Sequence, residues 1–189
     1  DWDNSDGTLT LKINQRNKLK DSEEEEPLVI PVKLSIISDE INHEERVITV
    51  SKSSQEFKFF NLTKSKSTPT VSFLRNFSAP INYKTDLTNE EYLFIFENDS
   101  DDFSKWEAAQ QLIRTSILSR ALGQVENNIE NALINTFDNS LRCLSEKKRG
   151  LLASLLTIPT ITELELYQQE IDPLSLDNAY NEFSLLIAK

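Results

Sequence analysis

The sequence predicts two successive units: an antiparallel Ig-like β-sandwich over residues 1–86, then a stacked α-helical-hairpin segment over residues 87–189. Three observations predict this division. Apolar and polar residues alternate in the first part, which is the period of a β-strand with one buried face. In the second part apolar residues recur at three- and four-residue steps, which is the period of an amphipathic helix. Signals for helix starts also occur repeatedly after residue 87.

The first unit is expected to contain several short strands separated by polar connectors. The two clearest runs are Thr8–Asn14 and Leu28–Ile36, in each of which every second residue is apolar. Pro31 lies inside the second run, and because proline cannot donate to a β-ladder it indicates an edge strand or a bulge. Short strands at this spacing are typical of a sandwich. Further strands are expected at Arg46–Val50, Gln55–Asn61, Pro69–Arg75 and Ile81–Tyr83.

The second unit is expected to contain six helices joined by short links, as in an array of helical hairpins. Capping boxes, in which side chains satisfy the free amides of a helix start, are predicted at Thr88 with Glu91, Ser104 with Glu107 and Thr160 with Glu163. Asp172-Pro173 is a capping residue followed by proline at the first helical position. Gly123 and Gly150 are placed as helix breakers or C-terminal caps. The helices are expected near residues 88–97, 103–122, 127–143, 146–157, 160–168 and 173–187.

The apolar faces of these helices supply the candidate core. Trp106, Ala109, Ile113 and Ile117 recur at helical spacing in the second helix, and Trp106 is interpreted as a core anchor. The third helix carries Ile129, Leu133, Phe137 and Leu141 in the same pattern.

The charge balance excludes nucleic acid as a partner. The chain has 31 acidic and 20 basic side chains and a net charge of −11, and 18 of the acids but only 8 of the bases follow residue 85. Such a surface repels phosphate backbones. It is interpreted mainly as a device for solubility, and the alternative is an acidic wall that attracts cationic peptides.

Other classes are excluded by single features of the sequence. No run approaches the roughly 18–20 apolar residues that a membrane span needs, so no membrane is expected as a partner. Asp1-Trp2-Asp3-Asn4 does not resemble a signal peptide, and we expect a cytoplasmic location. Cys143 is the single cysteine, which excludes a disulfide framework, and it is interpreted as a small core residue.

No residue is assigned to a catalytic, cofactor-binding or metal site. A zinc peptidase needs His-Glu-x-x-His, but in His43-Glu44-Glu45-Arg46-Val47 the second histidine position holds Val47, and His43 is the single histidine. There is no glycine-flanked serine for nucleophilic hydrolysis. Asp101 and Asp102 could act as a general acid and base, but their place beside Ser104 favours stabilisation of a helix start.

Several strings nevertheless resemble one family. Leu74-Arg75-Asn76-Phe77-Ser78-Ala79-Pro80 resembles the Leu-Arg-Gly-Phe-Ser-Ala-Pro segment of bacterial-type aminopeptidase N, in the zinc-dependent metallopeptidase family with the gluzincin signature. Residues 98–110, which read Asn-Asp-Ser-Asp-Asp-Phe-Ser-Lys-Trp-Glu-Ala-Ala-Gln, resemble its His-Asp-Ser-Asp-Pro-Phe-Asn-Arg-Trp-Glu-Ala-Gly-Gln. Trp2 with Gly7-Thr8 resembles the family's entry to the sandwich. Later matches at Leu156–Pro159 and Ile171–Pro173 are colinear, so the resemblance spans almost the whole chain.

The sequence departs from the family pattern at structural positions. Asn76 stands where the pattern has glycine, and we expect the turn there to change, because asparagine tolerates left-handed geometry less freely than glycine. Asn98, Asp102 and Ala109 replace histidine, proline and glycine.

The resemblance implies that this chain is a non-catalytic segment of a larger zinc aminopeptidase, which removes N-terminal amino acids from peptides. The family's zinc ligands, substrate-amine loop and catalytic tyrosine belong to an upstream domain, and none of those strings is present here. The segment would bridge that domain to the helical domain that caps the active site. Its partners would be the remaining domains of the same polypeptide, and zinc would be bound by the parent enzyme rather than by this segment.

Two other functions stay open. One is a stand-alone protein-interaction module, made of a β-sandwich and a helical adaptor. The other is an independent small hydrolase, which would be active without any upstream residues.

Overall fold

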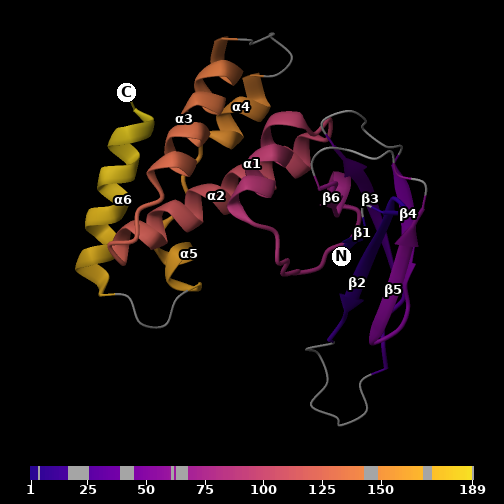
Figure 1. Ribbon diagram of the computed structural model, residues 1–189. Coiled ribbons are helices and arrows are strands. Elements are labelled where there is room, and N and C mark those ends of the chain that lie inside the picture. The colour runs from indigo at the N-terminus through magenta and orange to yellow at the C-terminus, as the bar shows by residue number, and fades with distance from the viewer. Residues whose placement is uncertain are drawn as a thin grey trace. The chain divides into compact units, whose positions relative to one another are not determined.

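The computed structural model describes residues 1–3, 5–16, 26–38, 45–60, 62, 68–142, 149–167 and 172–188. The chain forms two compact units, Asp1–Lys84 and Thr85–Lys189. The first contains the strands and the second contains the α-helices (Figure 1). The predicted fold class, an Ig-like β-region followed by a helical array, is confirmed.

The first unit consists of two three-stranded antiparallel sheets. One sheet has the order β1 (Trp2–Asp3), β2 (Thr8–Asn14) and β5 (Ser54–Phe59), and β2 pairs with β5 in a register that places Leu9 opposite Phe59. The other sheet has the order β4, β3 and β6. These strands span Arg46–Val50, Ile30–Ile37 and Thr70–Phe73, respectively.

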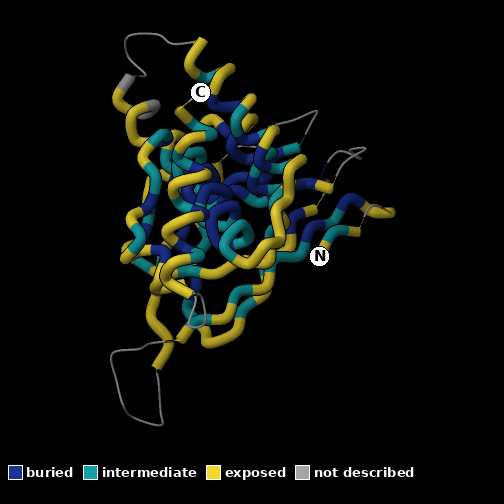
Figure 2. Tube along the Cα trace, turned by 90° about the vertical axis from the view of Figure 1, so that its left-hand side faces the viewer, coloured by how far each residue is buried: buried dark blue, intermediate teal, exposed yellow. Residues whose placement is uncertain are grey.

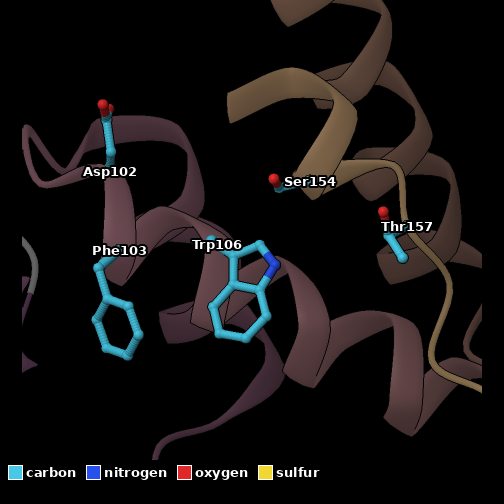
Figure 3. A pocket seen from close by; sticks show the side chains of 5 residues that line it. All are labelled: Asp102, Phe103, Trp106, Ser154 and Thr157. Atoms are coloured by element: carbon cyan, nitrogen blue, oxygen red, sulfur yellow. The ribbon is translucent and has the colours of Figure 1, made fainter. Parts of the chain in front are cut away.

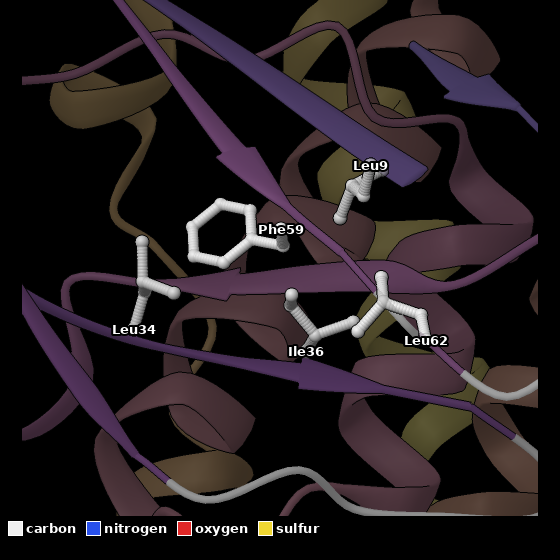
Figure 4. Close-up of a cluster of buried hydrophobic side chains, with 5 residues drawn as sticks. All are labelled: Leu9, Leu34, Ile36, Phe59 and Leu62. Atoms are coloured by element: carbon white, nitrogen blue, oxygen red, sulfur yellow. The ribbon is translucent and has the colours of Figure 1, made fainter. Parts of the chain in front are cut away.

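The core of this unit lies between the two sheets. Leu9 and Phe59 come from one sheet, Leu34 and Ile36 come from the other, and Leu62 completes the buried cluster (Figure 4). Each of these side chains is at most 5% exposed. The alternation read from the sequence therefore does place one face of each sheet in a shared apolar interior.

The location of Pro31 differs from the prediction of an edge strand or bulge. Strand β3 is the central strand of its sheet, but Pro31 lies in the part that pairs only with β4, whereas pairing with β6 begins at Leu34. Successive backbone amides of a strand point to opposite edges of the strand. The backbone nitrogens of Pro31 and Lys33 therefore point to the edge of β3 along which β6 pairs from Leu34 onward. Lys33 N–H donates there to the Ser78 hydroxyl, at 2.9 Å. Proline is tolerated because its nitrogen faces the edge along which β6 does not yet pair, so the ladder with β4 needs no hydrogen from it.

A left-handed turn carries the chain away from β6. Leu74, Asn76 and Phe77 all have positive φ, at 61°, 55° and 48°, around the short 3-10 helix η1 (Arg75–Phe77). Asparagine is among the few residue types that occupy this region with little strain, which suits Asn76 to the turn. Arg75 is buried, and its Nε donates to Glu45 Oε1 at 3.0 Å.

The strand expected at Ile81–Tyr83 is not formed. Ile81 N–H donates locally to the Ala79 carbonyl at 2.9 Å, so it does not join a ladder. Tyr83 instead packs its ring against Phe73, with 5.4 Å between the ring centroids. The prediction failed because residues that would suit a strand are held in a local turn.

The second unit contains six helices at positions close to those expected. They are α1 (Asn89–Asn98), α2 (Asp102–Ala121), α3 (Asn127–Arg142), α4 (Arg149–Leu155), α5 (Ile161–Glu165) and α6 (Pro173–Ile187).

The predicted helix starts are mostly confirmed. The capping boxes of Thr88 with Glu91 and of Thr160 with Glu163 are both formed, and Asp172 caps α6 ahead of Pro173. The capping box predicted at Ser104 with Glu107 is wrong, because Asp101 already accepts the Ser104 amide and starts α2 earlier.

The two glycines predicted as breakers behave differently. Gly123 follows α2 with φ of +72°, and its amide donates to the Arg120 carbonyl at 3.0 Å, as a C-terminal cap does. Gly150 lies inside the first turn of α4 and does not break the helix.

Helix α2 forms the centre of the helical unit, with α1, α3, α4 and α6 packed against it (Figure 1). Its residues Ala109, Ile113 and Ile117 are completely buried, as the helical spacing predicted. In α3 the buried pair is Leu133 and Phe137, and the Phe137 ring lies 5.1 Å from the ring of Phe96 in α1. In Figure 2 the buried segments, in dark blue, are surrounded by exposed segments, in yellow.

Candidate functional site

A surface cavity of about 480 Å³ lies beside the first turns of α2. Asp102, Phe103 and Trp106 of α2 line one side, and Ser154 and Thr157, in and just after α4, line the other (Figure 3). The rings of Phe103 and Trp106 are 5.8 Å apart at an interplanar angle of 40°. In Figure 3 the indole nitrogen lies on the side of Trp106 that faces Ser154 and Thr157.

The polar groups around this cavity are mostly acceptors. The Ser154 hydroxyl donates its proton to the Gly150 carbonyl at 3.1 Å, and the Thr157 hydroxyl donates to the Ala153 carbonyl at 3.0 Å. Both hydroxyl oxygens therefore keep lone pairs for a ligand. Asp102 is exposed and adds a carboxylate.

The two walls of the cavity are joined by the buried side chain of Gln110. Its amide donates to the Thr157 carbonyl at 2.9 Å, which links α2 to the end of α4. This contact holds the segment after α4 against α2.

A second polar group of side chains lies farther along α2. The Arg114 guanidinium stacks over the ring of Tyr167, 4.3 Å from its centroid, and lies 4.0 Å from the carboxylate of Glu107. Burial raises the pKa of Glu107, and the nearby Arg114 charge offsets part of that rise. Burial also raises the pKa of Tyr92. This group joins α2 to the residues after α5.

The third group is an ion-pair network among three helices. Arg120 of α2 pairs with Glu130 of α3 at 2.6 Å and with Glu182 of α6 at 3.0 Å. Glu130 is only 3% exposed, whereas the Glu182 side chain is 62% exposed. The Arg120–Glu130 pair is therefore the buried part of the network.

The residues weighed from the sequence do not form a catalytic site in the described part of the chain. His43, Glu44 and Cys143 lie outside the described residues. Glu45 pairs with Arg75 and Lys33, and strand β4 begins at Arg46. Across the described ranges, no three histidine, cysteine, aspartate or glutamate side chains are grouped so as to hold a metal ion.

The adjacent acids Asp101 and Asp102 have separate roles. Asp101 is buried, and its carboxylate accepts from both the amide and the hydroxyl of Ser104 at 2.9 and 2.8 Å. This confirms the helix-start interpretation for both acids, because Asp101 caps α2 and Asp102 is the acidic residue of its first turn. Asp102 also lines the cavity.

Sequence reasoning missed the cavity because it interpreted Trp106 as a core anchor. Trp106 is only partly buried, and it lines the cavity opposite Ser154 and Thr157. The available signal was the aromatic pair Phe103 and Trp106 three residues apart, next to an acid, on a helix whose apolar face continues with smaller residues.

Within the described residues, no helix has both the length and the apolar character to cross a lipid bilayer.

Comparison with known protein families matches almost the whole chain, in two parts. The family described as "Domain of unknown function (DUF3458) Ig-like fold" matches residues 1–86. The family described as "Domain of unknown function (DUF3458_C) ARM repeats" matches residues 89–189.

Individual relatives are similar to this chain over only part of their own length. Aminopeptidase N of Caulobacter vibrioides is 33% identical over 120 residues, which is 64% of this chain and 14% of that protein. Aminopeptidase N of Escherichia coli is 26% identical over 182 residues, covering 88% of this chain and 20% of that protein. The crystal structure of Legionella pneumophila aminopeptidase A in complex with aspartic acid matches with a TM-score of 0.77 and 22% identity, over 100% of this chain and 21% of that one. That structure supports the fold alone, and the chain spans about a fifth or less of each relative.

Proposed function

This chain belongs to the DUF3458 family, through an Ig-like domain and an ARM-repeat domain, and we propose that it is a non-catalytic segment of an aminopeptidase. The observation that supports this most directly is the colinear match of both domains, together with the alignment of E. coli aminopeptidase N over 88% of the chain. In this proposal the segment bridges the catalytic domain to the helical domain that caps the active site.

The parent protein is proposed to be a cytoplasmic zinc enzyme that removes N-terminal amino acids from peptides. Zinc in such a site would activate a water molecule for attack on the first peptide bond. The described residues of this chain provide no cluster of metal ligands, so they do not fit a zinc site, and no step of hydrolysis is assigned to them. Their role is mechanical.

The structure gives physical support for such a mechanical role. Each unit has its own buried core, and the helical unit is also crosslinked by Arg120, which pairs with Glu130 and Glu182 on two other helices. A helical unit held in this way would keep its shape while it limits the access of peptides to the active site.

The proposal is tested with an antibody raised against this chain. Immunoprecipitation from source-cell extract should recover a protein several times larger than 21.7 kDa, together with hydrolysis of alanine p-nitroanilide. The activity should disappear with 1,10-phenanthroline and return with added zinc. Antibody blocked beforehand with the purified chain is the control. A single band at 21.7 kDa with no activity would replace this proposal with a stand-alone interaction module.

A further inference from the structure

The cavity between α2 and α4 has features that the proposed bridging role does not require. It is a shallow depression that is open to solvent, with a volume of about 480 Å³. The two aromatic rings of Phe103 and Trp106 form one wall, and hydroxyl groups form the other.

The chemistry of the lining selects for a positive ligand. The faces of Trp and Phe rings attract cations, and Trp does so most strongly. Asp102 contributes a negative charge, and the Ser154 and Thr157 oxygens remain acceptors because their protons are used within the helix.

The charge of the chain acts in the same direction. The net charge is −11, and most of the excess acid follows residue 85, in the sequence that forms this unit. A negative field raises the local concentration of cations near such a surface.

The indole N–H of Trp106 adds one donor to the cavity, on the side that faces α4 (Figure 3). A simple amine has no acceptor for it, whereas a peptide carries a carbonyl oxygen close to the side chain. We propose that this depression binds the side chain of a lysine or arginine within a peptide. The cation lies against the aromatic rings, where the negative charge of Asp102 attracts it, and a peptide carbonyl accepts from the indole N–H. This inference does not depend on the proposed enzyme activity.

The test uses the full chain with Trp2→Phe, which leaves Trp106 as the single tryptophan. N-acetyl-lysinamide is titrated while Trp106 fluorescence and its indole N–H signal in NMR spectra are recorded. We expect saturable changes in both. N-acetyl-norleucinamide, which lacks the charge, should bind at least tenfold more weakly. Equal binding of the two would overturn the proposal.

Matched variants separate the site from the general charge of the surface. Asp102→Asn should weaken binding about three- to tenfold, whereas Asp138→Asn, which removes one exposed charge from α3, should leave it unchanged. Equal losses in the two variants would show attraction to the whole surface rather than a site. Thermal unfolding of each variant confirms that the fold is intact.

A third ligand separates peptides from free amines. n-Butylamine carries the ammonium group without a peptide carbonyl, so we expect it to bind at least threefold more weakly than N-acetyl-lysinamide. Equal affinity would overturn the assignment to peptides.

Discussion

At the scale of single residues, Gly7 is held in a conformation that other residues cannot adopt easily. Its φ is +69°, and a Cβ atom there would lie 2.5 Å from the Leu62 carbonyl oxygen. The amide of Leu62 in turn donates to the Gly7 carbonyl at 3.0 Å. The chain thus needs glycine here for both backbone angle and space.

Three glycine-to-alanine variants separate these two requirements. We expect Gly7→Ala to destabilise the first unit by on the order of 3 kcal/mol, because it adds a backbone clash to the strain. Gly123 has a φ of +72°, but a Cβ atom there would meet open space. Gly123→Ala should therefore lower the free energy of unfolding by about 1 kcal/mol. Gly150 lies in α4, and a Cβ atom there would meet open space. Because alanine favours helices more than glycine does, Gly150→Ala should leave the free energy of unfolding unchanged or raise it by up to about 1 kcal/mol. Urea denaturation measures all three, and equal effects would refute the interpretation.

Glu107 makes a prediction about pH. Burial raises its pKa in the folded protein. At pH values between the ordinary pKa of a glutamate and this raised pKa, the folded state therefore holds a proton that the unfolded state has lost. The ionised form therefore costs stability, and that cost grows as pH rises from the unfolded to the folded pKa. We expect Glu107→Gln to raise the melting temperature of the second unit at pH 8, and to raise it less at pH 4. Glu165→Gln, an exposed acid at the end of α5, is the control and should shift neither value.

At the scale of elements, the Arg120–Glu130 pair joins α2 to α3 in a nearly dry environment. Removal of one partner leaves a buried charge without compensation. We expect Arg120→Met to destabilise the second unit by about 3 kcal/mol, and Arg120→Met with Glu130→Met to recover most of that loss. Arg142→Ala removes an exposed pair with Asp138 and should cost about 0.5 kcal/mol or less. A double variant as unstable as Arg120→Met would contradict this account.

The same scale shows which features the sequence could predict. Helix starts at Thr88, Thr160 and Asp172 were predicted correctly because their capping bonds involve neighbours three residues away. The start at Ser104 was wrong because Asp101 competes for the same amide.

Features that depend on contacts between distant segments were harder to predict. The strand at Ile81–Tyr83 was wrong because a local turn and a ring contact with Phe73 decided its conformation. The cavity beside Trp106 depends on where α4 lies, which no pattern in α2 reveals. The pairing of Arg120 with Glu130 likewise follows from packing rather than from spacing.

At the scale of the whole molecule, each unit has its own core and carries one of the two tryptophans. Trp2 packs against the sandwich core, and Trp106 lies on α2. We expect Leu34→Ala to destabilise the sandwich by about 3 kcal/mol because it leaves a cavity. Trp2 fluorescence, recorded with Trp106→Phe, should then show a lower urea midpoint.

The converse measurement uses Trp106 fluorescence with Trp2→Phe. Leu34→Ala should leave the urea midpoint reported by Trp106 unchanged. Leu112→Ala, at a buried position of α2, should lower that midpoint. If both tryptophans report the same shifted midpoint for Leu34→Ala, the two units unfold as one.

The contact between Lys33 and Ser78 also affects how the protein behaves at high concentration. An uncovered strand edge is a template on which a second chain can add its own strand, and this is a common route to aggregation. Along the edge of β3 ahead of Leu34, Pro31 has no amide hydrogen to offer, and the hydrogen of Lys33 is occupied by the Ser78 hydroxyl. A proline and a serine thus protect this stretch from recruiting foreign strands, without the need for another strand of the protein to cover it.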